Sequence, residues 1–356
     1  MQETLHHSAD PAENLLGSTK GQKPKHWYWD SWVLLSLSAM LAFTGGNLVI
    51  QSTSHLRFAA MEYVSTGSVI VCLVYFWVKG QRKIPGRRVL FKESKNAGVA
   101  KRQLDWRLIM CYVYGAVFEG AIFYAITATF LTCQYAQLNA GIAQTIWGFT
   151  PFLSSILDYC MYGTKLLNYQ IGGLACMITA GALISLSHVF AEAPSSNESE
   201  EESDLLPIFL PVLVSCSMPI ICSGFGVFTR WVFTKTTMAS DDLTFGYFLV
   251  YKGLAVLVQP VYFSFNEIDW TLYLFGSIGS CFDLLGCYFA NAAIETGAPI
   301  GAVMALCDSQ TLIMTAIGAI RMQVLPNWMQ LVGLGLGMIG AVVLALYHYL
   351  CLNKKH

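Results

Sequence analysis

Ten apolar stretches, each long enough to cross a lipid bilayer, occupy most of this 356-residue chain. A helix needs about 20 predominantly apolar residues to cross roughly 30 Å of hydrocarbon. The runs are continuously apolar and do not alternate with polar residues, which favours helices over the strands of a β-barrel. We place the stretches near residues 32–50, 58–78, 108–131, 139–161, 170–189, 207–229, 243–264, 272–293, 298–320 and 328–350.

The composition agrees with an integral membrane protein. Apolar residues make up 55% of the chain and charged residues only 12%, against about 25% charged residues in soluble proteins. The net charge of −1 gives no indication of a nucleic-acid partner. The eleven cysteines show no spacing typical of a metal site. We therefore expect no metal and no other cofactor.

The loop charges predict the orientation of the chain. The connection between the second and third stretches is strongly basic, which places it on the cytoplasmic side. Both termini then fall on that side, and both carry lysines. The connection between the fifth and sixth stretches falls on the opposite side, where it is acidic and contains a glycosylation acceptor at Asn197-Glu198-Ser199. Which membrane holds the protein, the plasma membrane or an internal one, stays open.

The acidic connection divides the chain into two halves of five stretches each, and the sequences of the two halves are weakly similar. Shifted by 160 residues, Gly141 falls on Gly301 and Gln170 on Gln330, and Phe118-Glu119 has a counterpart in Phe282-Asp283. Because each half has five stretches, the second half would enter the membrane from the opposite side. The predicted fold is all-α, with ten transmembrane helices in two inverted five-helix repeats. The predicted parts are a cytoplasmic tail (1–31), the first repeat (32–189), an acidic lumenal or extracellular linker (190–206), the second repeat (207–350) and a cytoplasmic tail (351–356).

This pattern resembles the drug/metabolite transporter superfamily, in particular its EamA-like and nucleotide-sugar-transporter-like members. The residues that carry the resemblance are Ala140-Gly141, Pro151, Gln170-x-x-Gly173, Gly301, Gln330-x-x-Gly333 and Gly340. Many relatives have a glutamate at the ends of the fourth and ninth helices, where this chain has Lys165 and Gln323. The resemblance covers about residues 30–350. It implies a ten-helix carrier that works by alternating access, with a cavity lined mainly by helices 1–4 and 6–9.

Four ionisable side chains fall near the centres of their stretches, namely Glu119, Lys252, Asp283 and Asp308. A charge at bilayer depth is costly, so each is a candidate for substrate binding or coupling. Lys252 could bind an anionic group of a substrate or form a salt bridge with Asp283 or Glu119. Either of these two carboxylates could also exchange a proton during transport.

Asp308 and two aromatic side chains are the remaining members of the candidate site. Asp308 lies in the polar run Cys-Asp-Ser-Gln-Thr, which favours a wetted surface over a lipid-facing one. Trp147 and Tyr251 are aromatic candidates for stacking on a substrate, although most aromatic residues of membrane proteins pack against neighbours or lie at the interface.

These observations predict a multi-pass secondary transporter that moves a small organic metabolite, with proton coupling or exchange as its mechanism. One alternative is a nucleotide-sugar or phosphorylated-metabolite antiporter of an internal membrane, although one lysine among several carboxylates better fits a neutral or zwitterionic substrate. A channel or a non-transport membrane protein is an alternative of another class. An enzyme is not expected, because no catalytic cluster is recognisable. The expected partners are the bilayer, a small-molecule substrate and, through the glycine-rich tenth stretch, a second copy of the chain.

Overall fold

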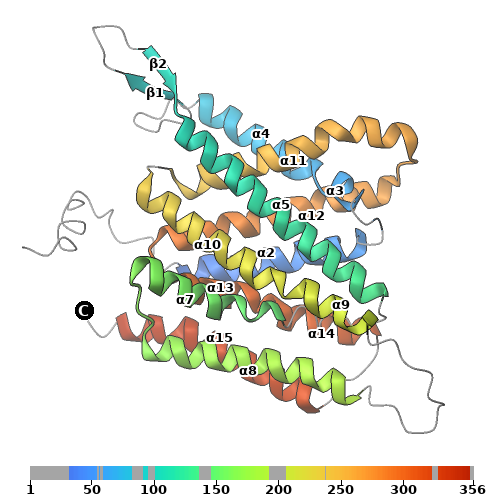
Figure 1. The fold of residues 1–356 in the computed structure, drawn as a ribbon, viewed down its shortest axis with the longest axis vertical. Coiled ribbons are helices and arrows are strands. Elements are labelled where there is room, and N and C mark those ends of the chain that lie inside the picture. Colours follow the sequence, from blue (N-terminus) through green and yellow to red (C-terminus); the bar gives the residue numbers. More distant parts are fainter. Residues whose placement is uncertain are drawn as a thin grey trace, which may run out of the picture. The chain divides into compact units, whose positions relative to one another are not determined.

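Helices account for nearly all of the structure, a computed structural model that describes residues 32–53, 56, 59–81, 91–94, 101–135, 146–191, 206–236, 238–322 and 328–352. The helices of the first half are α2 (Trp32–Thr53), α3 (Ala60–Tyr63), α4 (Thr66–Gln81), α5 (Trp106–Tyr135), α7 (Thr150–Tyr162) and α8 (Asn168–Ala191). Those of the second half are α9 (Leu206–Ser215), α10 (Ser217–Lys235), α11 (Ser240–Phe265), α12 (Trp270–Glu295), α13 (Ile300–Asp308), α14 (Gln310–Met322) and α15 (Trp328–Leu352). Each predicted stretch overlaps one or two of these helices, which are labelled in Figure 1.

Among the described residues, five helical segments are long and apolar enough to cross a membrane, judged by length and composition. They are Trp32–Thr53, Trp106–Tyr135, Leu210–Lys235, Ser240–Phe265 and Trp270–Glu295. Many large apolar side chains on these helices are exposed, as Leu257 and Val261 illustrate, and such a surface fits contact with lipid better than contact with water. The described part of the chain therefore fits an integral membrane protein.

Among the described residues, the second, sixth and ninth predicted stretches are each divided between two helices. One break, at Cys216 between α9 and α10, has a local cause in Pro219, which has no N–H to donate to the carbonyl four residues earlier. Another, at Ser309 between α13 and α14, lies in the middle of the polar run. Irregular backbone at membrane depth is tolerated where it is covered by protein or lines a cavity. Residues on both sides of Ser309 line a cavity.

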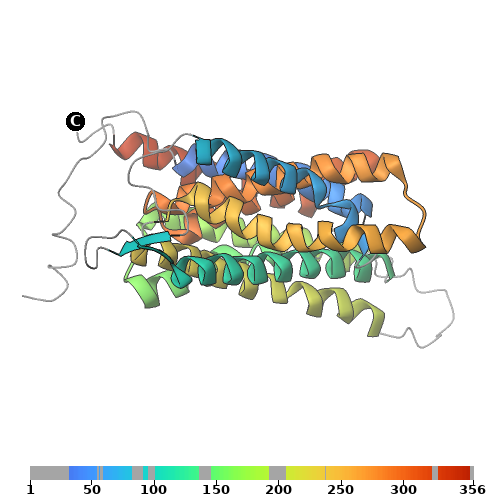
Figure 2. The ribbon, with the colours of Figure 1, turned by 90° about the horizontal axis from the view of Figure 1, so that it is seen from above.

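The helices run roughly along one direction and pack in pairs that combine both halves of the chain (Figures 1 and 2). The most extensive pairs are α2 with α12 and α8 with α15. The second pair uses the glycines of the tenth stretch, since a Cβ added at Gly340 would lie 2.8 Å from the carbonyl oxygen of Gly173. Much of this glycine-rich face is therefore occupied within the chain, and a homodimer stays a prediction.

A short β-hairpin in the basic connection was not predicted from the sequence. Strand β1 (Phe91–Ser94) pairs antiparallel with β2 (Lys101–Leu104), and Phe91 lies opposite Leu104. Its four-residue strands carry several charges and too few apolar residues to stand out from a loop. The hairpin lies at the same end of the bundle as the C-terminus of α4 and the N-terminus of α5 (Figure 1).

Candidate functional site

Lys252 lies in α11 with its side chain fully buried. Its Nζ atom is 3.7 Å from Oδ2 of Asp283 on α12 and 4.4 Å from the centre of the Phe123 ring on α5. The Sδ atom of Met61, on α3, lies 3.8 Å away. The structure thus contains the Lys252–Asp283 ion pair, which lies within the second half and packs against two side chains of the first half.

Tyr251 supports this arrangement from the neighbouring position. The centre of its ring is 5.0 Å from the Lys252 ammonium, and its hydroxyl donates to the sulfur of Met61 at 3.2 Å. A cation enclosed by aromatic faces gains cation–π stabilisation that partly offsets its desolvation. In this conformation Tyr251 therefore holds Lys252 in place.

Glu119 lies on α5, opposite the Lys252–Asp283 pair, and is buried. The thiol of Cys287 donates to its Oε2 atom at 3.6 Å. Oxygens of Glu119 and Asp283 and the sulfur of Cys287 all lie within 4.8 Å of one another. Two carboxylates and a thiol are suitable ligands for a transition metal, but the Lys252 ammonium beside Asp283 opposes a second cation on that carboxylate.

A cavity of about 100 Å³ lies at this centre. Residues of α2, α5, α7, α10, α12, α13 and α14 line it, so both halves contribute. Four of the six predicted site residues are on its wall, namely Glu119, Trp147, Asp283 and Asp308. Lys252 and Tyr251 are not among the residues that line it. Within the described part of the chain, Lys252 acts on the cavity through Asp283.

Two polar atoms of this wall have no hydrogen-bond partner among the residues that the structure describes. Trp147 is only 3% exposed, and its indole Nε1 donor is buried and unpaired. The Oδ2 acceptor of Asp308 is also buried and unpaired. By contrast, Asn47 Nδ2 donates to Oε1 of Gln310 at 3.0 Å and joins α2 to α14. Buried polar groups are normally satisfied, so the two unpaired atoms indicate that the cavity receives a ligand or water.

A wider groove of about 610 Å³ runs between α7 and α8, and its walls are mostly apolar. Lys165 is its one charged residue among those described. Binding sites normally combine an enclosed apolar surface with a few convergent polar groups. The smaller cavity meets this description better, so we place the candidate site there.

An ion pair outside the cavity joins α7 to α10. Arg230 donates to both carboxylate oxygens of Asp158, at 2.6 and 2.7 Å, and to the carbonyl oxygen of Gly297 at 2.9 Å. Asp158 also accepts from the backbone N–H of Ile300 at 3.1 Å. Arg230 was not predicted from the sequence because the predicted sixth stretch ends at residue 229, whereas α10 continues to Lys235.

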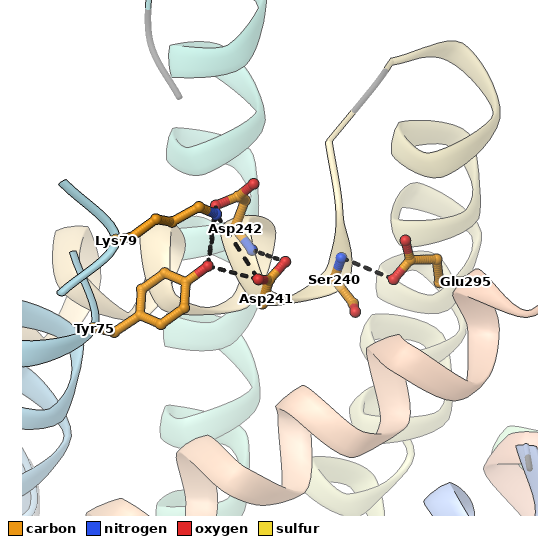
Figure 3. A network of polar contacts seen from close by, with 6 residues as sticks. All are labelled: Tyr75, Lys79, Ser240, Asp241, Asp242 and Glu295. Carbon is orange, nitrogen blue, oxygen red and sulfur yellow. Dashed lines mark hydrogen bonds and ion pairs between the residues drawn. The ribbon is translucent and has the colours of Figure 1, made fainter. Parts of the chain in front are cut away.

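A second polar network joins α4, α11 and α12 (Figure 3). Lys79 forms an ion pair with Asp242 and lies 3.8 Å from Oδ2 of Asp241. The Tyr75 hydroxyl donates to Asp241 at 2.7 Å, and the backbone N–H of Ser240 donates to Glu295. Both networks lie at the ends of α10 and α12 and the starts of α11 and α13, so they occupy the same end of the bundle.

Asn197, the predicted glycosylation site, lies outside the described residues, as do the predicted N-terminal tail, residues 353–356 of the predicted C-terminal tail and most of the linker. The start of the predicted fourth stretch, including Gly141 and Gln144, is also outside them.

Comparisons with known proteins establish the fold alone. No protein-family model matches the sequence, and no curated protein is significantly similar to it. Among solved structures, 28 chains match. One of them, described only as "Crystal structure of protein", is 13% identical with a TM-score of 0.58, and the match covers 90% of this chain and 98% of that one. Similarity at this identity indicates a shared arrangement of helices and says nothing about activity.

Proposed function

We propose that this chain is a secondary transporter with ten transmembrane helices in two inverted repeats, of the type found in the drug/metabolite transporter superfamily. The observation that carries the proposal is a cavity inside an apolar helical bundle whose wall contains three carboxylates, Glu119, Asp283 and Asp308. Ionisable groups at such depth are expensive and typically mark a substrate or ion pathway.

The helix pairs support the repeat. If the five helices of each half correspond in order, α2 corresponds to α9–α10, α3–α4 to α11, α5 to α12, α7 to α13–α14 and α8 to α15. The α2–α12 pair then matches the packing of α5 on α9 and α10, and α4–α12 matches α5–α11. The α7–α10 pair matches the packing of α2 on α13 and α14. Three other pairs, α4–α11, α7–α13 and α8–α15, map onto themselves, whereas the α11–α12 pair has no comparable counterpart between α4 and α5 among the described residues.

A close contact repeats at the residue level. A Cβ added at Gly45 of α2 would lie 3.2 Å from the ring of Phe282 on α12. In the corresponding pair, a Cβ added at Gly224 of α10 would lie 3.4 Å from the ring of Phe118 on α5. These phenylalanines immediately precede Asp283 and Glu119, so the repeat would place the two acidic residues at equivalent positions.

Alternating access requires that one side of the site closes while the other opens. The Arg230–Asp158 pair and the Lys79 network tie helices together at one end of the bundle, which the positive-inside rule predicts to be cytoplasmic. We interpret them as a closed cytoplasmic gate. Opening toward the cytoplasm would then require both networks to separate.

The test is counterflow in proteoliposomes that contain the purified protein. A thermal-shift screen with amino acids, amines, nucleosides, nucleotide sugars, organic acids and sugar phosphates first selects a compound. Saturable uptake of that labelled compound, accelerated by the same unlabelled compound inside, is expected for a carrier. Asp283→Asn and Glu119→Gln should each abolish counterflow. Glu62→Gln is the control, because Glu62 is also partly buried but does not line the cavity.

Uptake that is neither saturable nor accelerated by internal compound would indicate a channel. Normal counterflow in both cavity variants would show that this cavity is not the transport site.

A further inference from the structure

The cavity wall carries more negative than positive charge. It has three carboxylates, and none of the described residues that line it is a lysine or arginine. Lys252 supplies one positive charge, 3.7 Å from Asp283. The described polar contact of Glu119 is with the weak thiol donor of Cys287, and Oδ2 of Asp308 has no partner. Among the described residues, two carboxylates therefore remain without a cation of their own, and a buried uncompensated charge is costly.

A second observation, independent of the carboxylates, points to a ligand. The Trp147 indole N–H is buried on the same wall with no acceptor. Leaving a buried donor unpaired costs about 1–3 kcal/mol, so a molecule in the cavity that offers an acceptor would be stabilised there. Phe43 and Phe225 also line the cavity, and aromatic faces attract ammonium groups.

We infer that the substrate is a small organic amine with a net positive charge and one hydrogen-bond acceptor. Its ammonium group would lie between Glu119 and Asp308, and its acceptor would face Trp147. The inference rests on the proposed function, because it treats this cavity as the transport site. An anionic substrate such as a nucleotide sugar would meet like charges. It would also exceed a cavity of about 100 Å³, which is well below the roughly 300 Å³ of pockets for drug-sized ligands.

Four probes that share a two-carbon skeleton separate the effect of charge from that of size. They are 2-aminoethanol (cation), glycine (zwitterion), glycolate (anion) and ethane-1,2-diol (neutral). Each is titrated to 100 mM against the full-length protein in detergent, at constant ionic strength, and thermal unfolding is recorded. We expect 2-aminoethanol to raise the unfolding temperature at the lowest concentration and glycolate to have no effect. Stabilisation by glycolate at lower concentrations than 2-aminoethanol would overturn the inference.

Two variants assign the contacts. Asp308→Asn and Glu119→Gln should each raise the half-saturating concentration of 2-aminoethanol at least tenfold. Glu62→Gln should not change it, although this residue also has a buried unpaired carboxylate oxygen. An unchanged response in both cavity variants would refute the site.

A third variant keeps the test informative if those proteins fold poorly. Trp147→Phe keeps an aromatic ring but removes the donor. It should weaken the binding of 2-aminoethanol several-fold. The binding of ethylamine, which lacks the hydroxyl acceptor, should be unchanged. Equal weakening of both amines would contradict the placement of the acceptor. Amine binding without counterflow would defeat the proposed function alone, whereas counterflow of an anion would defeat this inference alone.

Discussion

Replacing Lys252 by methionine tests whether the buried ion pair stabilises the second half of the protein. Methionine keeps the length and most of the volume of the side chain but removes its charge. Asp283 would then be left in the bundle without its cation. Asp283→Asn is the reciprocal change, and the double variant Lys252→Met/Asp283→Asn carries no charge at either position.

The magnitude follows from the geometry. Unit charges 3.7 Å apart attract by about 4.5 kcal/mol at an effective dielectric constant of about 20. The contact of the ammonium with Phe123 adds about 0.5–2 kcal/mol. Breaking a buried pair by removing one partner typically costs about 3–5 kcal/mol, whereas replacing both partners is often close to neutral. We therefore expect each single variant to lose about 3–5 kcal/mol and the double variant to recover most of that loss.

The assay is unfolding by sodium dodecyl sulfate in mixed micelles, with helix content and tryptophan fluorescence as readouts. The four proteins form a double-mutant cycle, and the coupling energy is the quantity of interest. A coupling near zero, in which the double variant loses the sum of the two single losses, would refute the reasoning. It would mean that Lys252 and Asp283 act independently and that the ion pair contributes nothing to stability.

Three further outcomes are expected. Asp158→Asn should speed maleimide labelling of Cys287 from the cytoplasmic side of inside-out vesicles at least tenfold, because it weakens the proposed gate; an unchanged rate would mean that this ion pair is no gate. Asn197→Gln should remove any glycan-dependent mobility shift, and a reporter that finds residues 191–205 in the cytosol would reverse the orientation. Gly67→Ala should cost about 1–3 kcal/mol, because its Cβ would clash with the carbonyl oxygen of Ser277 on α12, whereas Gly253→Ala, which meets open space, should cost nothing; equal losses would contradict the packing of α4 on α12.

The sequence predicted the helices well because continuous apolar runs leave the chain few alternatives in a membrane. It could not predict the breaks at Cys216 and Ser309, since each stretch remains apolar enough to read as one span. The break at Ser309 depends on what surrounds the polar run, and only the packed structure shows that its neighbours line a cavity.

The cost of charge at bilayer depth selected Glu119, Asp283 and Asp308, and the structure brings these three side chains to the wall of one cavity. The depth of a residue in the membrane gives no information about the face of the helix from which its side chain points. Lys252 is central along α11, yet it points to Phe123 and Met61 and does not line the cavity. Arg230 was missed for a related reason, because a charged residue at the end of an apolar run marks the predicted end of the span even when the helix continues.

Two groups of charged side chains in the described helices differ in their partners. Those at the predicted cytoplasmic end, such as Arg230 with Asp158, are paired and hydrogen-bonded across helices. Two of those at the central cavity, Glu119 and Asp308, form no ion pair with another described residue. A ligand shifts a conformational equilibrium only by its differential affinity for the two states. In the proposed transporter, a cation bound between the central carboxylates would have to favour the cytoplasm-open state by at least the cost of separating the end networks. Moving a conformational equilibrium from 1:99 to 99:1 takes about 5.5 kcal/mol of differential binding free energy. Variants that weaken the gate reduce this requirement, so they should lower the substrate concentration needed for exchange. The limit is reached when the gate no longer closes without substrate.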